Sequence, residues 1–323
     1  MRFIIQRLLL FVAALFGVSI LVFVALRILP GDVAAVMAGT AATPERIAEL
    51  RSQFGLDRSY LEQYRDWAAG LLHGDLGTSV LTGRTVASQV ATRGSLTFPL
   101  IVMSLFVALA IGLPLGCAAV IARGRVLAGA LHVVAIVGGA VPALWGGLLL
   151  ILMFARGVGV FGVFPSQGFP STGWHDAGAA FASLVLPALA TGIVAGAGVM
   201  RYTRAALGDL ADGGAVVMAM ACGMTRRQAV LRVGLRLAAP QLVSVAGLTF
   251  AQMITGVMVV ESLFALPGLG ALLVGDVGNR DLIAVQSELF LLAAFFLVLG
   301  LVVDLLHRLL DPRLKSATGR EGR

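Results

Sequence analysis

Six long runs of apolar residues punctuate the chain. The runs cover residues 8–26, 96–122, 127–154, 181–200, 240–260 and 289–306. A helix that crosses the hydrocarbon core of a bilayer needs about 20 mostly apolar residues, so each run is long enough to span it. The first run exceeds the apolar segment of a secretory signal, usually about 7–15 residues, and we expect it to be an uncleaved span. The pattern predicts an all-α membrane protein with six transmembrane helices.

The region between the first two runs, residues 30–95, has the composition of a soluble segment. Thr43 followed by Pro44 predicts a helix start, because Thr suits the N-cap and Pro the first helical position. Gly55 is expected to end that helix, and a second helix is expected over about 59–72. The predicted apolar sides consist of Ile47, Leu50 and Phe54, and of Leu61, Tyr64, Trp67 and Leu71. We expect a helical insertion outside the membrane that packs on the mouth of the bundle.

Fifteen of the 24 Lys and Arg residues lie on one side of the predicted spans, whereas acidic residues balance the arginines of the 30–95 segment. The fifteen precede the first run, follow the sixth, and occupy the connections between the second and third and between the fourth and fifth. These residues are Arg2, Arg7, Arg123, Arg125, Arg201, Arg204, Arg226, Arg227, Arg232, Arg236, Arg308, Arg313, Lys315, Arg320 and Arg323. The positive-inside rule makes that side cytoplasmic, so we expect both termini in the cytoplasm and the 30–95 insertion outside.

This pattern predicts four parts. They are an N-terminal transmembrane helix at 1–29, the extracytoplasmic segment at 30–95, a five-helix core at 96–308 with a cytoplasmic loop at about 205–239, and a cytoplasmic tail at 309–323. Within the core, Gly112 and Gly116, and Gly192 and Gly196, have the small-xxx-small spacing that lets helix backbones approach closely. The spans also contain Pro114, Pro142 and Pro187, which indicate interruptions that serve either ordinary packing or a hinge.

Composition agrees with lipid as the solvent. The chain has 323 residues, of which 59% are hydrophobic and 13% charged, and its mean hydropathy is +0.95. The net charge of +7 does not indicate nucleic-acid binding, because the arginines flank apolar runs instead of alternating with aromatics on a soluble face. Lys315 is the only lysine, and it follows Leu314 instead of the glycine of a Gly-Lys-Ser/Thr sequence, so the sequence excludes a Walker A site.

Candidate chemistry inside the chain is sparse. Two cysteines, Cys117 and Cys222, are too few for a disulfide framework, and the histidines are scattered without metal-ligand spacing. The carboxylates Glu261, Glu288 and Asp304 lie near span ends, where we expect them to reach the interface or pair there. A secondary carrier usually needs buried carboxylates for its coupling ion, so their scarcity counts against a secondary carrier and indicates that the energy comes from another source. No metal site and no catalytic set is expected.

One stretch combines an apolar half with a basic half. Residues 215–236 read AVVMAMACGMTRRQAVLRVGLR. The first ten are apolar but too few to cross a bilayer, and the remainder carries four arginines. This segment is expected to lie at the cytoplasmic edge of the membrane, buried against protein or headgroups.

Several motifs, in order, resemble those of a known family. They are RILPGDVAAVMAG, ATPERIAELRSQFGLDRSYLEQY, LLHGDLGTSVLTGRTV, PALWGGLLLILMFA followed by FPSQGF, and VVESLFALPGLGALLV followed by RDLIAVQ. The chain is similar over almost its whole length to the B-type permease subunit of dipeptide/oligopeptide/nickel ABC importers. This resemblance implies a six-helix ABC importer permease bundle in a bacterial cytoplasmic membrane. It further implies a transport subunit, and not an enzyme, that forms half of a pathway for di- or oligopeptides.

The resemblance assigns a role to the 215–236 stretch. Ala219, Ala221 and Gly223 fit the Ala-x-Ala-x-Gly pattern of the family's cytoplasmic EAA-type loop, a coupling helix that seats in a groove of the ATPase subunit. The implied coupling residues are Ala219, Ala221, Gly223, Met224, Thr225, Arg226 and Arg227. Small residues allow a close fit, and Met218, Met220 and Met224 offer adaptable apolar contact. Where relatives are usually charged or polar, this chain has Val217, Met218, Met220 and Cys222. An amphipathic helix resting on the membrane is the alternative.

The resemblance also implies partners. They are a second homologous permease subunit, two cytoplasmic ATP-binding subunits, an extracytoplasmic substrate-binding protein and membrane lipid. ATP and Mg would be bound by the partner ATPases, with no cofactor in this chain. Docking of the binding protein is expected at the insertion, with Asp57, Tyr64 and Asp75 as candidates, although the insertion is equally suited to be a structural cover.

The segment ALPGLGALL, residues 265–273, is rich in Pro and Gly and predicts a re-entrant or capping turn. Glu261, Pro267, Gly268 and Gly270 are therefore candidates for a gate at the outer mouth, or for a plain structural turn. Two other functional classes stay open for the chain as a whole. A self-contained secondary carrier or channel would work without an ATPase, and a membrane enzyme would need a convergent nucleophile, base or metal set that the sequence does not offer.

Overall fold

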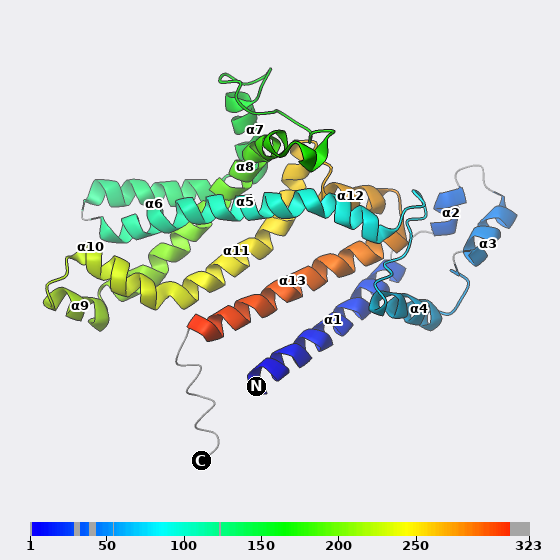
Figure 1. Ribbon diagram of the computed structural model, residues 1–323, viewed down its shortest axis with the longest axis horizontal. Helices are drawn as coiled ribbons and strands as arrows, with labels where there is room; N and C mark the ends of the chain where they lie inside the picture. Colours follow the sequence, from blue (N-terminus) through cyan, green and yellow to red (C-terminus); the bar gives the residue numbers. More distant parts are fainter. Residues whose placement is uncertain (1, 29–32, 39–42, 54, 123, 311–323) are drawn as a thin grey trace, which may run out of the picture. The chain divides into compact units, whose positions relative to one another are not determined.

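The computed structural model describes residues 2–28, 33–38, 43–53, 55–122 and 124–310 (Figure 1). Arg123 and most of the predicted tail, 311–323, lie outside the described residues. The regular elements in the described ranges are helical, with isolated β-bridges at Thr78–Thr85 and Ala155–Phe164. They are α1 (Arg2–Ile28), α2 (Val33–Ala38), α3 (Pro44–Gln53), α4 (Tyr60–Leu72), α5 (Val86–Ile121), α6 (Arg125–Ala140), α7 (Ala143–Phe154), η1 (Gly173–His175), α8 (Ala177–Ala211), α9 (Gly214–Ala221), α10 (Arg226–Ala229), η2 (Val230–Gly234), α11 (Leu235–Leu263), α12 (Leu269–Gly278) and α13 (Leu282–Leu310).

Five helices in the described ranges are long and apolar enough to cross a membrane. They are Ile4–Ile28, Val86–Ile121, Ala177–Ala211, Arg226–Leu263 and Leu282–Leu306. Each covers one of the predicted runs and extends beyond it, because polar residues continue the helix past the apolar stretch. The all-α membrane fold predicted from the sequence is confirmed.

The third predicted span is broken into two helices, an interruption of the kind that Pro142 had indicated. Helices Gly129–Ala140 and Ala143–Phe154 meet at a bend of 102°, and Figure 1 shows α7 turning away from α6. Pro142 is the N-cap of α7, and Val141 before it has an extended backbone (φ −76°, ψ 122°). A residue that precedes proline is disfavoured in the helical region, so the helix stops there. The count is therefore five spans, or six if the bent pair forms one.

The chain divides into two compact units, each described here by itself. The first comprises Met1–Ser95 and Ala271–Leu301, and the second Leu96–Gly270 and Val302–Arg323. In the first unit, Tyr64 and Trp67 of α4 pack with Phe23 of α1, and Trp67 also meets Phe290 of α13 edge to face at 5.6 Å between ring centroids. The Tyr64 hydroxyl lies 2.8 Å from Ser19 Oγ. These contacts attach α4 to two membrane helices.

The expected helices of the insertion are present. Ser59 caps α4 and forms a capping box with Glu62, in which each side chain bonds the other residue's backbone N–H. Gly55 adopts φ +62° after α3, as expected for a residue that ends a helix. Leu50 is buried, whereas Leu61 of the predicted apolar side is 68% exposed, and Phe54 lies outside the described residues.

The second unit is built around close contact between α5 and α8. A Cβ added to Gly112 would lie 2.6 Å from Val199 Cβ, and one added to Gly192 would lie 2.6 Å from Val107 Cβ. Neither position has room for a side chain, which confirms the close helix approach predicted from the small-residue spacing. Helix α8 also packs against α6, α7 and α11, and 17 of its residues are buried. It is therefore the central helix of this unit.

Candidate functional site

The 215–236 stretch forms two short helices joined by a tight turn. Helix α9 ends at Ala221, and Gly223 turns the chain with φ +91°, a conformation that side chains disfavour. Thr225 then caps α10 and forms a capping box with Gln228. A π-helical turn, Val230–Gly234, joins α10 to the long helix α11. The predicted coupling segment is thus a defined helix–turn–helix that continues directly into a membrane helix.

The segment is fixed to the second unit by a buried apolar cluster. Ala211, Val216, Ala229 and Val230 form this cluster, and partly buried hydrophobic side chains pack against it. These partly buried residues are Val120, Ile121, Ala219, Met220, Met224 and Val233. Three methionines were expected to offer contact to a partner; Met220 and Met224 are partly buried against this cluster, and Met218 is exposed.

A second set of apolar residues in the segment faces outward. Val217 is 48% exposed and Met218 is 67% exposed, and both Ala221 and Cys222 are exposed as well. We call Val217, Met218, Ala221 and Cys222 the outward apolar set. Of the predicted coupling residues, Ala221, Gly223, Thr225 and Arg227 are exposed, and Arg226 lies 3.8 Å from the carboxylate of Asp212. Of the residues that depart from the family pattern, Val217, Met218 and Cys222 therefore lie on the surface, whereas Met220 is half-buried.

Glu261 organises the turn before α12. Its side chain is fully buried and accepts hydrogen bonds from Thr97 Oγ1 at 2.5 Å and from the Gly270 N–H at 2.9 Å. The Leu269 N–H in turn donates to Thr97 Oγ1 at 2.9 Å. A Cβ on Gly268 would overlap the Glu261 carboxylate, so only glycine fits there. These bonds join α5, α11 and the start of α12 within the second unit.

Glu261 and Glu288 were expected to reach the membrane interface or to pair there. The structure buries both within the protein, with Glu261 0% exposed and Glu288 4% exposed. Thr97 comes from a distant part of the chain, and its bond and that of Gly270 offset the cost of burial, because a buried carboxylate needs hydrogen bonds. Pro267, by contrast, is exposed, and Ala265, two residues before it, has φ +49°. Glu261, Gly268 and Gly270 lie together, with Pro267 on the surface of the same turn.

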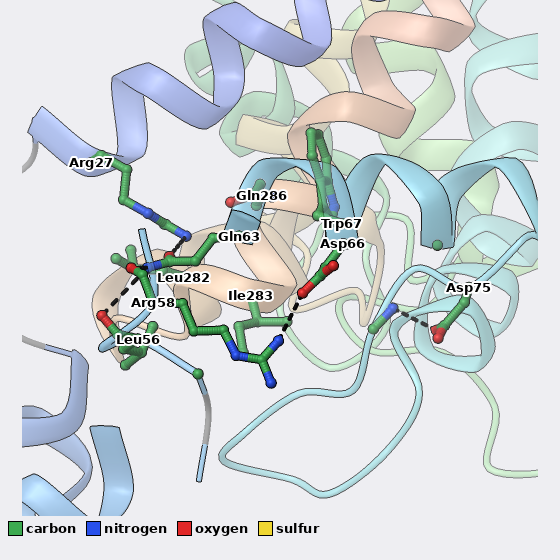
Figure 2. Close-up of a pocket in the computed structure, with 13 residues that line it drawn as sticks. Arg27, Leu56, Arg58, Gln63, Asp66, Trp67, Asp75, Leu282, Ile283 and Gln286 are labelled. Atoms are coloured by element: carbon green, nitrogen blue, oxygen red, sulfur yellow. Dashed lines mark hydrogen bonds and ion pairs between the residues drawn. The ribbon is translucent and has the colours of Figure 1, made fainter. Parts of the chain in front are cut away.

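A pocket of about 280 Å³ lies in the first unit, and Figure 2 shows the side chains that line it. Gln63 is at its centre: its Oε1 accepts from Arg27 Nη2 at 2.8 Å, and its Nε2 donates to the Arg58 carbonyl at 2.9 Å. Arg58 pairs with Asp66 at 2.9 Å. Asp75, at the other end in Figure 2, accepts from the Gly77 N–H at 2.9 Å. The pocket thus carries both signs of charge.

Of the three residues predicted to dock a partner, one lines this pocket. Asp75 does so, whereas Asp57 is exposed outside it, and the hydroxyl of Tyr64 is engaged with Ser19. Arg27, Gln63 and Asp66 were not predicted as site residues. The available signal in the sequence was one side of the predicted helix, formed by Gln63, Asp66, Trp67 and Gly70. The prediction considered only apolar positions on this helix, and therefore did not use the amide and the carboxylate of that side.

A buried acidic group in the first unit was also missed. Asp276 and Glu288 are 7% and 4% exposed, and both oxygens of Glu288 are buried without a hydrogen-bond partner among the described residues. Burial raises the pKa of Asp276, and the charge of Asp281 raises it further. Asp281 itself accepts from Ser79 Oγ at 2.7 Å. In the described part of the chain, these acids and the histidines and cysteines form no group of three or more that could hold a metal ion.

Comparison with known proteins agrees with this geometry. Residues 108–316 match the family described as "Binding-protein-dependent transport system inner membrane component", and residues 1–92 match "Binding-prot-dependent transport system membrane comp, N-term". The chain is 31% identical over 335 residues to the dipeptide transport system permease protein DppB of Escherichia coli (strain K12), covering 98% of this chain and 99% of DppB. It is 34% identical over 315 residues to the glutathione transport system permease protein GsiC of the same strain, with the same coverage.

A solved structure shares the fold. It is titled "Inward facing conformations of the MetNI methionine ABC transporter", and the match has a TM-score of 0.54 at 21% identity, covering 69% of this chain and 96% of that chain. The chain therefore belongs to the family of binding-protein-dependent transport system inner membrane components, as a multi-pass permease subunit of an ABC importer and not an enzyme.

Proposed function

We propose that this permease forms half of the translocation pathway of a peptide importer and is driven through the 215–236 segment by a separate ATPase. Peptides are favoured as cargo because the two relatives named above transport dipeptides and glutathione, which is itself a small peptide. In this proposal the second half of the pathway comes from a homologous permease. ATP and Mg are bound by two cytoplasmic subunits, and an extracytoplasmic binding protein delivers the cargo.

The observation that carries the coupling role is the outward apolar set. Val217, Met218, Ala221 and Cys222 expose apolar surface next to the Gly223 turn, while the other side of the segment is anchored by Val216 and Val230. An exposed apolar patch on a fixed support is typical of a protein contact surface. A push on Ala219–Thr225 would pass through the buried cluster and the π-turn to α11.

The proposal assigns both termini to the cytoplasm on the distribution of Arg residues. The insertion at 30–95 is then external, and its pocket, with Asp75 at one end, is a docking surface for the binding protein. Asp57 is available at the surface beside it, whereas Tyr64 contributes by holding α4 in place. The turn built on Glu261, Pro267, Gly268 and Gly270 would serve as the outer gate.

Cross-linking tests the coupling contact. The exposed thiol of Cys222 gives a native handle, whereas Cys117 is buried. In membranes that contain the assembled importer, a short bifunctional maleimide is expected to join this chain to an ATP-binding subunit, and Cys222→Ser abolishes the product. If no ATP-binding subunit co-purifies with this chain, the importer assignment fails and a self-contained carrier or channel takes its place.

Transport measurements complete the test. Met218→Glu places a charge in the outward apolar set without disturbing the buried cluster, and it is expected to lower ATP-driven peptide uptake by proteoliposomes at least tenfold. Gly223 is unsuitable for this purpose, because any side chain is strained at φ +91°. The matched control is Val160→Glu, at an apolar position that is 83% exposed and far from the segment in sequence. Equal uptake by wild type and Met218→Glu would contradict the coupling role.

A further inference from the structure

A second hollow, of about 300 Å³, lies within the second unit among α6, α7, α8 and α11. Gly139 and Ala143 line it on the two sides of the α6–α7 bend. The other lining residues belong to α8 and α11, and they are Thr191, Val194, Ala195, Gly198, Arg201, Tyr202, Thr249, Gln252, Met253 and Gly256. Neither the coupling segment nor the Glu261 turn contributes to it.

The lining is polar for helices of this hydropathy. Arg201, Tyr202 and Gln252 are all exposed toward solvent or a partner, and no acidic residue lines the hollow. Polar side chains within a membrane helix are costly unless they face protein or water, and they mark substrate pathways. The hydroxyls of Thr191 and Thr249 are already bonded to the carbonyls of Pro187 and Val245. The groups that remain available to a ligand are therefore a guanidinium, a phenol and an amide.

The glycines of the hollow differ from those at the α5–α8 contact. A Cβ on Gly198 or Gly256 would meet no atom within 4 Å, whereas one on Gly112 or Gly192 would collide with the facing helix. Space next to Gly198 and Gly256 is thus open. Gly139 lies against the Arg201 guanidinium, because a Cβ added to Gly139 would lie 3.5 Å from Arg201 Nη1. The hollow therefore has open space beside Gly198 and Gly256, and a cation at Arg201.

We propose that this hollow is the part of the cargo pathway that this chain contributes, and that Arg201 binds the carboxylate of the peptide as it passes. An arginine pairs with carboxylates through two parallel hydrogen bonds, and the absence of acidic neighbours leaves its charge uncompensated within the hollow. Gln252 and Tyr202 supply hydrogen bonds for peptide amides. Because Arg201 is exposed, the attraction is weak, as a pathway that must release its cargo requires. The inference rests on the proposed peptide transport.

The first test fills the space. Gly256→Leu adds a large side chain where nothing obstructs it and where leucine suits a helix better than glycine, so the chain is expected to fold and assemble. ATP-driven uptake of radiolabelled dialanine and tetraalanine is expected to fall at least tenfold. The matched control is Gly300→Leu on α13, another open position, which should keep wild-type uptake. Wild-type uptake by Gly256→Leu would overturn the proposal, as would loss of the partner permease, because the hollow would then be a packing surface.

The second test measures the effect of the Arg201 charge on a reaction in the hollow, and it does not depend on delivery of cargo. In assembled complexes that carry Cys117→Ala and Cys222→Ala, Gln252→Cys provides a single thiol in the hollow. Its modification by an anionic sulfonatoethyl thiosulfonate is compared with that by a cationic trimethylammonioethyl thiosulfonate. Arg201→Gln is expected to lower the anionic-to-cationic rate ratio about fivefold. Arg204→Gln, one turn along α8 and bonded to His132 at 2.6 Å, is the matched control and should leave the ratio unchanged.

The outcomes separate this inference from the proposed function. If the wild-type complex shows no ATP-driven peptide uptake, the proposed function fails. If it transports peptides but Gln252→Cys does not react, or the rate ratio is insensitive to Arg201→Gln, the inference fails alone. Loss of dialanine uptake in Arg201→Gln with recovery in Arg201→Lys supports the charge assignment. Protection of the thiol by anionic lipid but not by peptide would show that Arg201 holds a headgroup, which overturns the proposal.

Discussion

Thr97 Oγ1 donates a hydrogen bond to the Glu261 carboxylate at 2.5 Å, and the same oxygen accepts from the Leu269 N–H at 2.9 Å. The hydroxyl of one threonine on α5 therefore bonds both the carboxylate at the end of α11 and the N–H of the first residue of α12. Both Thr97 and Glu261 are buried, at 3% and 0% exposure, so neither group has water as a substitute partner. The turn before α12 depends on this pair for its position.

Thr97→Val is expected to destabilise this turn. Valine has the shape of threonine but leaves the Leu269 N–H and one carboxylate oxygen without this partner, and a buried group that loses its hydrogen bond costs about 1–3 kcal/mol. The Tm of the purified complex should fall. Thr92→Val removes a hydroxyl from the same helix, but there the side chain is exposed and bonds only the Ser88 carbonyl. An equal drop in Tm for both variants would show that the Thr97 bonds contribute nothing beyond local helix effects.

Gly268→Ala tests the packing of the same turn. Its methyl group would overlap the Glu261 carboxylate, and overpacking a filled interior costs about 1–3 kcal/mol. We expect lower Tm and reduced transport, because the carboxylate must move away from Gly270. Gly275→Ala, within helix α12 and seven residues after Gly268, meets open space and should be neutral or stabilising by up to about 1 kcal/mol. A Gly268→Ala protein as stable as wild type would show that the turn adjusts freely.

The spans and the insertion helices could be predicted because their signals are local. A run of apolar residues near the required length specifies a membrane helix by itself, and the Ser59–Glu62 capping box is complete within four residues. The inward placement of Met220 and Met224 could not be predicted. Nothing in the local sequence distinguishes them from the exposed Met218, and the difference arises from packing against α5 and η2.

The candidate sites were less predictable than the helices. Burial of Glu261 depends on Thr97, which is 164 residues away in sequence, and no periodicity connects the two. The α6–α7 bend had a visible signal in Pro142, but proline within an apolar run also occurs in continuous membrane helices. The hollow at Arg201 and Gln252 combines residues from α8 and α11 whose relation only the fold provides.

Asp276→Asn is expected to raise stability in a pH-dependent way. Burial raises the pKa of Asp276, so the folded state favours the protonated carboxyl. A group with a raised folded pKa contributes stability that is present below its unfolded pKa, about 3.9, and is lost as pH rises through the folded pKa. Asparagine is neutral at every pH and can donate to Glu288. The Tm gain over wild type should therefore be larger at pH 8 than at pH 5.

The control for Asp276→Asn is Asp57→Asn, which removes a carboxylate that is exposed in the same unit. Its Tm should match wild type at both pH values. A gain for Asp276→Asn that is the same at pH 5 and pH 8 would contradict the pH argument, because the benefit would then come from something other than titration of this carboxyl.

Ser59→Ala is expected to loosen the start of α4 and the pocket beside it. Loss of an N-cap side chain costs about 1 kcal/mol, and here the Glu62 carboxylate also loses the bond from the Ser59 hydroxyl while it keeps the bond from the Ser59 N–H. Hydrogen bonds from Ser59 lower the pKa of Glu62, so the capping box stabilises the helix above the unfolded pKa and is lost as pH falls through the folded pKa. Faster amide exchange at residues 61–63 in Ser59→Ala should therefore be most evident at neutral pH. Arg58→Gln, which removes an exposed ion pair to Asp66 of the same helix, is expected to change amide exchange little.

Because Gln63 connects α4 to Arg27, the Ser59→Ala variant also tests the docking surface. Accelerated exchange in Ser59→Ala without any loss of binding-protein affinity would show that the pocket is not the docking surface.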